Sequence, residues 1–306
     1  MSKTAFVFPG QGSQYPGMGR ELAGNFPQAR EVFEQANNCL GFDLARLCFE
    51  GPESDLQLTA NTQPAILAVS VAAQRVVFAE TGLVPDLVAG HSLGEYSALV
   101  CAEALSFEDA VLAVRQRGQL MQEAVPVGVG TMAAIMGLDR CALEEVCQQA
   151  AEGDVVAPAN YNSPGQVVIA GHVAAVERAM KLARERGAKR ALPLPVSAPF
   201  HCRLMQPAAL RLAEVLAPLN IGAMQVPVVS NVEAVAYDDG SRVRDLLVAQ
   251  VSSPVRWQES VEHMAARGIG RFVEIGPGKV LGGLIKRISK GVVLANVQEP
   301  ADLKEL

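Results

Sequence analysis

Gly90-His91-Ser92-Leu93-Gly94 stands between the apolar run 87–89 and the segment 95–100, so a G-x-S-x-G falls where a strand turns into a helix. This is the sequence of a nucleophile elbow. A side chain at either flanking position of so sharp a turn would clash, which explains the two glycines, and the central serine projects from the end of the strand. Its hydroxyl then lies above a helix amino terminus, where a developing oxyanion is favoured. The alternative is a glycine-rich turn in which Ser92 only caps a helix. The flanking pattern favours the catalytic interpretation.

Outward from the elbow, short apolar strands alternate with amphipathic helices, which is typical of a parallel sheet with helices on both faces. The middle third has a different pattern. Its predicted elements are a strand at 131–138, a helix at 141–151, strands at 155–159 and 166–170, a helix at 174–186 and a strand at 189–194. This βαββαβ order is that of a ferredoxin-like unit. We therefore expect an α/β fold with a large domain at 1–125 and 196–306 and an inserted small domain at 126–195.

After the insert, the pattern returns to that of the large domain. It predicts a helix at 203–216, a strand at 226–230, a helix at 257–266 and a strand at 271–275, followed by Gly276-Pro277-Gly278-Lys279 and a further helix. No internal repeat or low-complexity tract is visible in the sequence, which excludes a solenoid.

Composition narrows the functional classes. The chain has 306 residues, of which 50% are hydrophobic and 19% charged, as in a compact globular protein. A net charge of -6 argues against nucleic acid as a partner, because phosphate binding needs a surplus of Lys and Arg. We find no signal peptide and no uninterrupted apolar run of membrane-spanning length, so a cytoplasmic protein without a membrane partner is expected. The six cysteines form no C-x-x-C pair, and no metal site is predicted.

A serine hydroxyl needs a neighbouring base, and histidine is the usual one. The chain has four histidines. His91 is adjacent to Ser92 and points elsewhere in an elbow, while His172 and His263 are expected at the surface. His201 remains, in a proline-bearing loop before a helix. The positive potential of a helix amino terminus disfavours imidazolium, which keeps a base neutral. Elimination therefore selects His201, against the alternative of a histidine with no chemical role.

No Asp or Glu is recognisable as the group that orients His201. We expect Gln250, in a predicted loop before Val251-Ser252-Ser253-Pro254, to offer a backbone carbonyl to the imidazole.

The turn Gly10-Gln11-Gly12-Ser13-Gln14 follows the first predicted strand. It is compatible with a dinucleotide loop, a tight turn or a source of N–H groups for an oxyanion hole. Tyr15 occupies the third glycine position of G-x-G-x-x-G, which argues against a nucleotide site. The N–H groups of Gln11 and of Leu93, the residue after the nucleophile, would form an oxyanion pair.

Four motifs in this order resemble the malonyl-CoA:acyl carrier protein transacylases. They are Gly10-Gln11-Gly12-Ser13-Gln14, Gly90-His91-Ser92-Leu93-Gly94-Glu95, Asn162-Ser163-Pro164-Gly165-Gln166 and Gly276-Pro277-Gly278-Lys279. The resemblance implies an α/β-hydrolase-like large domain, a ferredoxin-like small domain and an active site in the cleft between them. It also implies that Ser92 is the nucleophile, His201 the base, and Gln11 and Leu93 the oxyanion donors.

The resemblance further implies that Arg117 binds the free malonyl carboxylate and that the Gln250 carbonyl steadies His201. Helical periodicity does not select Arg117, because Arg115 and Arg117 lie about 80° to opposite sides of the apolar stripe and each is compatible with a solvated flank. Phe200 resembles the malonyl-type pattern before the histidine of related polyketide acyltransferases.

The implied reaction is a ping-pong transfer of malonyl from malonyl-CoA to the phosphopantetheine thiol of acyl carrier protein, supplying fatty-acid synthesis. It needs no cofactor, since coenzyme A is part of the substrate. Acyl carrier protein is usually acidic, so a local basic patch is expected to dock it. The candidates are Lys181, Arg184, Arg186, Lys189 and Arg190 on one side and Lys286, Arg287 and Lys290 on another.

Other functions share parts of this pattern. A serine esterase or thioesterase would pass the acyl group to water, although no His-Gly-Gly-Gly loop is present. A patatin-like lipase would need Asp239, in a segment that is typical of a turn. A catalytically silent docking module would leave Ser92 unacylated.

Overall fold

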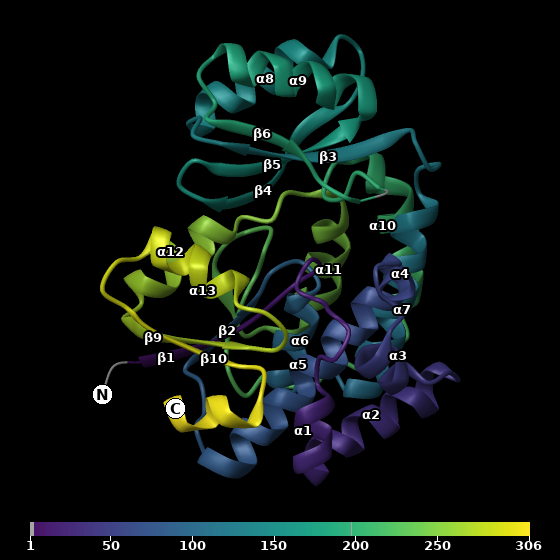
Figure 1. The fold of residues 1–306 in the computed structure, drawn as a ribbon, viewed down its shortest axis with the longest axis vertical. Helices are drawn as coiled ribbons and strands as arrows, with labels where there is room; N and C mark the ends of the chain where they lie inside the picture. Colours follow the sequence, from purple (N-terminus) through teal and green to yellow (C-terminus); the bar gives the residue numbers. More distant parts are fainter. Residues whose placement is uncertain (1–2, 197) are drawn as a thin grey trace.

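The computed structural model describes residues 3–196 and 198–306. Figure 1 shows two units, a large one around a six-stranded sheet and a small one around a four-stranded sheet. The first part of the large unit contains β1 (Lys3–Phe8), α1 (Arg20–Asn25), α2 (Pro27–Leu40), α3 (Leu44–Glu50), α4 (Glu53–Leu56), α5 (Thr59–Thr81), β2 (Leu87–Gly90), α6 (Gly94–Cys101) and α7 (Phe107–Glu123).

The small unit consists of the elements from β3 to β6. These are β3 (Gly130–Met136), α8 (Arg140–Ala151), β4 (Val156–Ser163), β5 (Gln166–His172), α9 (Val173–Glu185) and β6 (Arg190–Pro193). The chain then returns to the large unit with η1 (Arg203–Met205), α10 (Gln206–Leu216), β7 (Val228–Val229), β8 (Ala236–Tyr237), η2 (Gly240–Arg242), α11 (Val243–Ser252), α12 (Trp257–Ala266), β9 (Ile269–Ile275), α13 (Val280–Ile288), β10 (Val293–Val297) and η3 (Pro300–Glu305).

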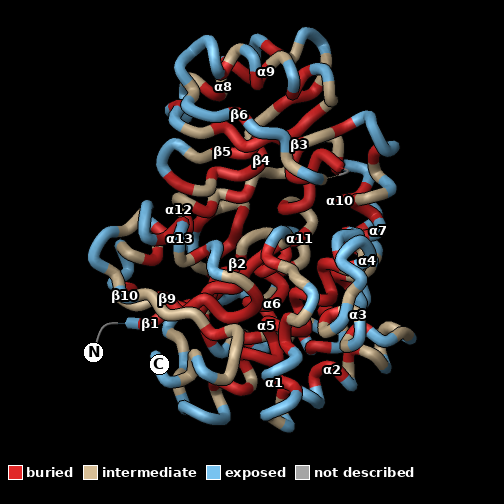
Figure 2. The backbone as a smooth tube through the Cα atoms, viewed as in Figure 1, coloured by how far each residue is buried: buried red, intermediate tan, exposed pale blue. Residues whose placement is uncertain are grey.

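The large sheet has the order β10-β9-β1-β2-β7-β8. All neighbours pair in parallel except β8, which is antiparallel to β7 at the edge. The predicted parallel sheet is therefore confirmed, with one antiparallel edge strand that the sequence pattern did not indicate. Five of the six residues of β1 are buried, as expected of a strand covered on both faces. Figure 2 shows that burial is densest around β1, β2 and α5.

The small sheet is antiparallel with the order β4-β5-β3-β6. Numbered within the unit, the strands lie 2-3-1-4 in space and are joined as βαββαβ, so the predicted ferredoxin-like arrangement is confirmed. α8 and α9 cover its outer face (Figure 1) and enclose a separate apolar core with the sheet. These elements lie inside the predicted limits 126–195, and the limits themselves stay a prediction.

α5 and α7 pack closely because of two backbone features. Pro64 lies inside α5 and has no N–H, so the Ala60 carbonyl one turn earlier lacks its helical donor. Arg115 of α7 donates to that carbonyl with Nη1 at 2.8 Å. A Cβ on Gly118 would lie 2.7 Å from the Thr59 carbonyl oxygen. Gly118 thus permits α7 to approach α5 closely, and the neighbouring Arg117 is buried in this arrangement.

α5 is relevant to the expectation that no uninterrupted apolar run spans a membrane. By length and composition it is the one helix within 3–196 and 198–306 that is long and apolar enough to cross a bilayer, although Ser70, Gln74 and Arg75 interrupt its apolar residues. However, 83% of its 18-residue apolar window is buried inside the structure. It is packed as the central helix of the large unit.

The two units are also joined by backbone pairing. The Val255 N–H donates to the Ala159 carbonyl at 2.8 Å, and the Tyr161 N–H donates to the Val255 carbonyl at 2.9 Å. Both small-unit partners lie in β4, the strand nearest the large unit in Figure 1. The segment that follows α11 is therefore fixed to the small sheet.

Candidate active site

The site lies at the carboxyl edge of the large sheet. β1, β2 and β7 are neighbours, and the loops after them carry Gln11, Ser92 and Asn231. β1 lies between β9 and β2 in the sheet. The strand order therefore extends to one side of β1 through β2 and to the other side through β9. A crevice outside the strand ends at such a point is the usual ligand site of an open α/β sheet.

The elbow at Ser92 has the sharp turn that the two glycines predict, and Ser92 itself has a strained backbone. Ser92 has φ 51°, in the left-handed region that only a fixed surrounding structure holds for a non-glycine residue. A Cβ on Gly90 would lie 1.8 Å from the Gly94 carbonyl carbon, and one on Gly94 would lie 2.1 Å from the Phe8 oxygen. Asn231 fixes the turn, since its Oδ1 accepts from the Ser92 N–H at 2.7 Å and its Nδ2 donates to the Gly90 carbonyl at 2.6 Å.

Ser92 and His201 come together as the sequence predicts. Ser92 Oγ lies 2.7 Å from His201 Nε2, and His201 Nδ1 lies 2.9 Å from the Gln250 carbonyl oxygen. Nδ1 must carry the proton to donate to a carbonyl, which leaves Nε2 free to accept the serine proton. His201 is only 4% exposed, so water does not compete for these contacts.

The expected position of Gln250 was wrong, although its carbonyl makes the expected contact. Gln250 lies in the last turn of α11 rather than in a loop. The last four carbonyls of a helix have no intrahelical donor, so the Gln250 carbonyl is free to accept from His201. Its role as an acceptor therefore follows from where α11 ends.

His201 is neutral for a different reason from the one expected. The predicted helix at 203–216 is divided into η1 and α10, and His201 itself has φ 59°. Burial lowers the pKa of His201 to about 3, and the positive charge of Arg117 acts in the same direction. The Gln250 carbonyl opposes this shift. A neutral imidazole throughout the physiological range is the consequence.

Arg117 is buried beside the serine, which excludes the solvated flank for this residue. Its side chain is 1% exposed, and Nη2 donates to Ser92 Oγ at 3.2 Å and to Gln250 Oε1 at 2.9 Å. Nη1 donates to Gln63 Oε1 at 2.7 Å. All three acceptors are neutral, so the guanidinium has no direct carboxylate partner in the described part of the chain.

Two backbone N–H groups beside Ser92 have no acceptor among residues 3–196 and 198–306. They belong to Gln11 and Leu93, and both residues line the cavity at the serine. A pair of free donors near a nucleophile is what an oxyanion hole requires.

The other histidines have structural partners. His91 Nε2 lies 2.9 Å from Asn162 Oδ1, the Val155 N–H donates to His172 Nδ1 at 3.0 Å, and the Ala236 N–H donates to His263 Nε2 at 3.1 Å. None of these contacts reaches Ser92.

Sequence reasoning missed several residues that hold the site. Asn231 follows a predicted strand whose neighbour carries Ser92, so its position at a strand end is a usable signal. Gln63 precedes the proline inside α5, and Glu95 belongs to the elbow motif, but neither has a pattern that indicates its contacts.

Three cavities meet near the serine. One of about 110 Å³ contains Ser92, Arg117 and Met132. It shares Gln11, His91, Asn160 and Leu194 with a groove of about 430 Å³ between β6 and α13, so the groove adjoins the cavity that contains Ser92.

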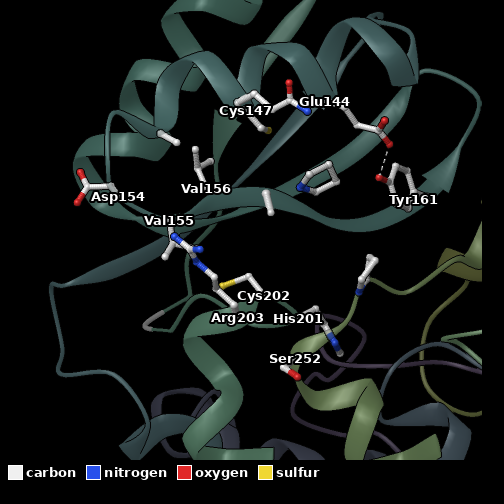
Figure 3. A pocket seen from close by; sticks show the side chains of 15 residues that line it. Glu144, Cys147, Asp154, Val155, Val156, Tyr161, His201, Cys202, Arg203 and Ser252 are labelled. Atoms are coloured by element: carbon white, nitrogen blue, oxygen red, sulfur yellow. Dashed lines mark hydrogen bonds between the residues drawn. The ribbon is translucent and has the colours of Figure 1, made fainter.

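The third cavity, of about 540 Å³, lies between the small unit and the loop after His201. Figure 3 shows Glu144 and Tyr161 on one side of it and His201 with Ser252 on the other. His201 thus separates this cavity from the one that holds Ser92.

Comparison with known proteins agrees with this geometry. The model of the family described as "Acyl transferase domain" matches residues 5–297. The chain is 54% identical over 303 residues to the malonyl CoA-acyl carrier protein transacylase of Salmonella typhimurium, covering 99% of this chain and 98% of the relative. It is 50% identical to the protein of that name from Bacillus subtilis, covering 99% and 96%.

Solved structures give the same result. An acyl carrier protein S-malonyltransferase from Vibrio cholerae superposes with a TM-score of 0.97 at 53% identity, covering 99% of both chains. A complex of a type II PKS acyl carrier protein with its malonyl-transacylase has a TM-score of 0.97 at 51% identity, covering 99% of this chain and 98% of the other.

Proposed function

Since this chain belongs to the acyl transferase family and is an acyltransferase, we propose that it transfers malonyl from malonyl-CoA to acyl carrier protein through an ester on Ser92. The contact that carries this proposal is the one between Arg117 and Ser92 Oγ, 3.2 Å apart in a buried pocket. It sets a fixed cation where the acyl group of a thioester substrate must lie. An acyl group with its own carboxylate is the natural match for it.

In the first half-reaction, His201 Nε2 takes the proton of Ser92 as Oγ attacks the malonyl thioester carbon. The carbonyl oxygen becomes an oxyanion, and the free N–H groups of Gln11 and Leu93 stabilise it. When the tetrahedral intermediate collapses, the carbon–sulfur bond breaks and His201 returns the proton to the departing thiolate. Coenzyme A leaves, and malonyl remains on Ser92.

The second half-reaction uses the same groups in reverse. The phosphopantetheine thiol of acyl carrier protein gives its proton to His201, and its sulfur attacks the ester carbon. The bond between this carbon and Ser92 Oγ then breaks, and His201 returns the proton to Ser92 Oγ. Gln250 holds the imidazole in one tautomer through both steps, because its carbonyl can accept only from a protonated Nδ1. The chain's own groups suffice for this chemistry, so we propose that no cofactor takes part.

The groove of about 430 Å³ suits the phosphopantetheine arm, because it leads from the surface to Gln11 and His91 at the serine. Its outer end is formed by Leu192 and Val280, whose side chains are 47% and 52% exposed. Arg287 on α13 donates to Gln166, which lines the same groove. We therefore place the docking of acyl carrier protein at α13, with Lys286, Arg287 and Lys290 as its basic patch.

We propose a cytoplasmic location and a role in fatty-acid synthesis. The burial of α5 inside the large unit supports a protein that is not inserted in a membrane. The division into 1–125 with 196–306 and 126–195 is likewise proposed, and the separate apolar core of the small unit supports it.

Intact-mass analysis tests the intermediate. Incubation with malonyl-CoA is expected to add one malonyl group to the chain, and Ser92→Ala is expected to remove the adduct because Ser92 Oγ is the hydroxyl hydrogen-bonded to His201 Nε2 among residues 3–196 and 198–306. Addition of acyl carrier protein is then expected to discharge the adduct onto the carrier thiol. A chain that forms no adduct would contradict the proposal and fit a silent docking module.

The same experiment separates transfer from hydrolysis. An esterase or thioesterase would discharge malonyl-Ser92 into water at the same rate with and without acyl carrier protein. We expect the adduct to persist in buffer and to disappear when the carrier is added.

An acyl-CoA panel tests the carboxylate partner. Arg117→Ala removes a charged hydrogen bond worth about 1.5–3 kcal/mol, so kcat/KM for malonyl-CoA is expected to fall roughly 10- to 150-fold. Acetyl-CoA, which has no free carboxylate, is expected to lose much less. Arg115→Lys on the same helix, which keeps a cationic donor for the Ala60 carbonyl, is the matched control, and an unchanged preference for malonyl in Arg117→Ala would refute the assignment.

A further inference from the structure

Two side chains of opposite charge are fully buried beside Ser92. Arg117 is 1% exposed and Glu95 is 0% exposed. They are linked by the side-chain amide of Gln250, whose Oε1 accepts from Arg117 Nη2 at 2.9 Å and whose Nε2 donates to Glu95 Oε2 at 2.6 Å. The amide therefore lies between the cation and the anion with its dipole aligned to both.

Glu95 is well placed to balance the charge of Arg117. Within residues 3–196 and 198–306 it is the one carboxylate whose charge acts on Arg117, and Arg117 is the one cation that acts on Glu95. The anchoring of Glu95 is incomplete: Oε2 also accepts from the Asn231 N–H at 3.2 Å, but Oε1 has no partner in this part of the chain.

We propose that Glu95 is a specificity-determining residue: it is the counter-charge of Arg117 in the free enzyme, and a malonyl carboxylate must compete with it. This inference rests on the proposed function, because it takes Arg117 as the partner of that carboxylate. When a malonyl carboxylate binds Arg117 while Glu95 is ionised, two negative charges lie beside one positive charge. The excess negative charge is costly because the site is buried and has a low dielectric constant. Glu95 therefore weakens the hold on malonyl, which allows the acyl group to move on to the carrier thiol. Acetyl brings no charge and is unaffected.

A proton can relieve the excess charge. Burial raises the pKa of Glu95 to about 7, while hydrogen bonds from Gln250 and Asn231 and the charge of Arg117 act in the opposite direction. A malonyl carboxylate nearby raises this pKa further, so malonylation takes up a proton from solvent at a pH above about 7.

The other titratable groups that face Glu95 are Arg117 from α7, Tyr96 on its own helix and Tyr237 from β8. Burial raises the pKa of both tyrosines, so they stay neutral. Of these four groups, Glu95 is the one with a pKa in this range.

The test measures how much enzyme carries malonyl, and how much carries acetyl, at equilibrium with fixed ratios of acyl-CoA to coenzyme A. Intact mass gives both occupancies. Glu95→Gln keeps an oxygen that can accept from Gln250 and Asn231 but removes the charge. At pH 8 we expect it to raise the malonyl-to-acetyl equilibrium ratio on the order of tenfold, the effect of one pKa unit of coupling. A merely structural role would change both adducts alike and leave the ratio unchanged.

Glu274→Gln is the matched control. Glu274 is also buried, at 1% exposed, but it accepts from the Leu281 and Gly282 N–H groups at the start of α13, away from Ser92. Its substitution is expected to leave the ratio at the wild-type value.

A pH series on the wild-type chain gives a second measurement that needs no variant. Because coenzyme A release is common to both adducts, the malonyl-to-acetyl ratio isolates Glu95. We expect the ratio to fall on the order of tenfold from pH 6 to pH 9 in the wild type and to stay flat in Glu95→Gln. If malonyl adducts form but the malonyl-to-acetyl ratio is the same in the wild type and Glu95→Gln and does not change with pH in the wild type, this inference alone is overturned. If the wild type forms no malonyl adduct, the proposed function is overturned as well.

Discussion

At the scale of single residues, the charge of Arg117 acts on two groups at once. It reaches Ser92 Oγ, where an acyl group is to be attached, and it lowers the pKa of His201, which must accept a proton. A cation in this position therefore makes the free imidazole a weaker base. A substrate carboxylate that pairs with Arg117 offsets that charge, so the imidazole becomes more basic when the matching acyl group is bound.

Removal of Arg117 is accordingly expected to change a pH profile. A general base acts when it is neutral, so the rate falls as the pH drops through its pKa. Without the guanidinium, the pKa of His201 rises above about 3 but stays below its ordinary value, because burial is the larger cause of the shift. Single-turnover acetylation of Ser92 by acetyl-CoA measures this directly.

In that measurement, the acid limb of Arg117→Ala is expected at higher pH than that of the wild type, while Arg115→Lys leaves it in place. If the acid limb of the rate profile lies at the same pH in Arg117→Ala and in the wild type, Arg117 does not lower the pKa of His201.

The residues that sequence reasoning found are those for which chemistry leaves few choices. The chain has only four histidines and one elbow serine, so Ser92 and His201 could be predicted by elimination. Arg117 was not separable from Arg115 by periodicity, because both flank the same stripe of α7. What distinguishes them is the contact of that helix with α5. Glu95 was interpreted only as part of the elbow motif, since the groups that hold its carboxylate, Gln250 of α11 and Asn231 after β7, are remote in sequence.

At the scale of elements, α7 depends on a glycine for its position against α5. The Gly118→Ala methyl group would meet the Thr59 carbonyl oxygen at 2.7 Å and Ala60 Cα at 2.8 Å, and backbone atoms cannot move aside cheaply. We expect Gly118→Ala to destabilise the fold by about 1–3 kcal/mol through overpacking and to displace Arg117. Urea unfolding gives the first quantity and the malonyl-to-acetyl preference the second.

Gly283→Ala is the control for this prediction. Gly283 lies exposed inside α13, and a Cβ there would have no atom within 4 Å. Helix propensity then predicts a gain of roughly 0.5–1 kcal/mol. Equal effects of the two substitutions would show that the approach of α5 and α7 is not limited by Gly118.

Element types were more predictable than element ends. Periodicity identified the strands and helices of the small unit, because each has a clear apolar face. It extended the helix after His201 back to 203, whereas the chain forms the separate turn η1 there before α10 begins at Gln206. It also assigned Gln250 to a loop, since Ser252-Ser253-Pro254 is typical of one, although α11 continues to Ser252.

At the scale of the whole molecule, docking of the carrier is expected to depend on the exposed cations at the end of α13 and just after it. Charge reversal at Lys286, Arg287 and Lys290 is expected to lower kcat/KM for acyl carrier protein on the order of tenfold. Malonylation of Ser92 by malonyl-N-acetylcysteamine, a small thioester without phosphates, is expected to be unchanged, because that substrate makes no contact at the patch.

The comparison variant reverses Lys181 and Arg186 at the end of α9. Arg186 already pairs with Glu145 at 2.8 Å, so this face is partly neutralised. We expect little effect there. If this variant slows transfer to the carrier and the α13 variant does not, the carrier docks on the small unit instead.

The pairing of Val255 with β4 has a consequence for recombining such proteins. The turn of α11 that supplies the acceptor for His201 leads directly into the segment hydrogen-bonded to Ala159 and Tyr161. In a chimera that takes 126–195 from a relative, β4 would come from the relative. The segment that pairs with it, and the Gln250 carbonyl that contacts His201, would come from this chain. Retention of activity in such grafts should require exchanging 252–257 together with the inserted module, so that the catalytic alignment is inherited as one piece.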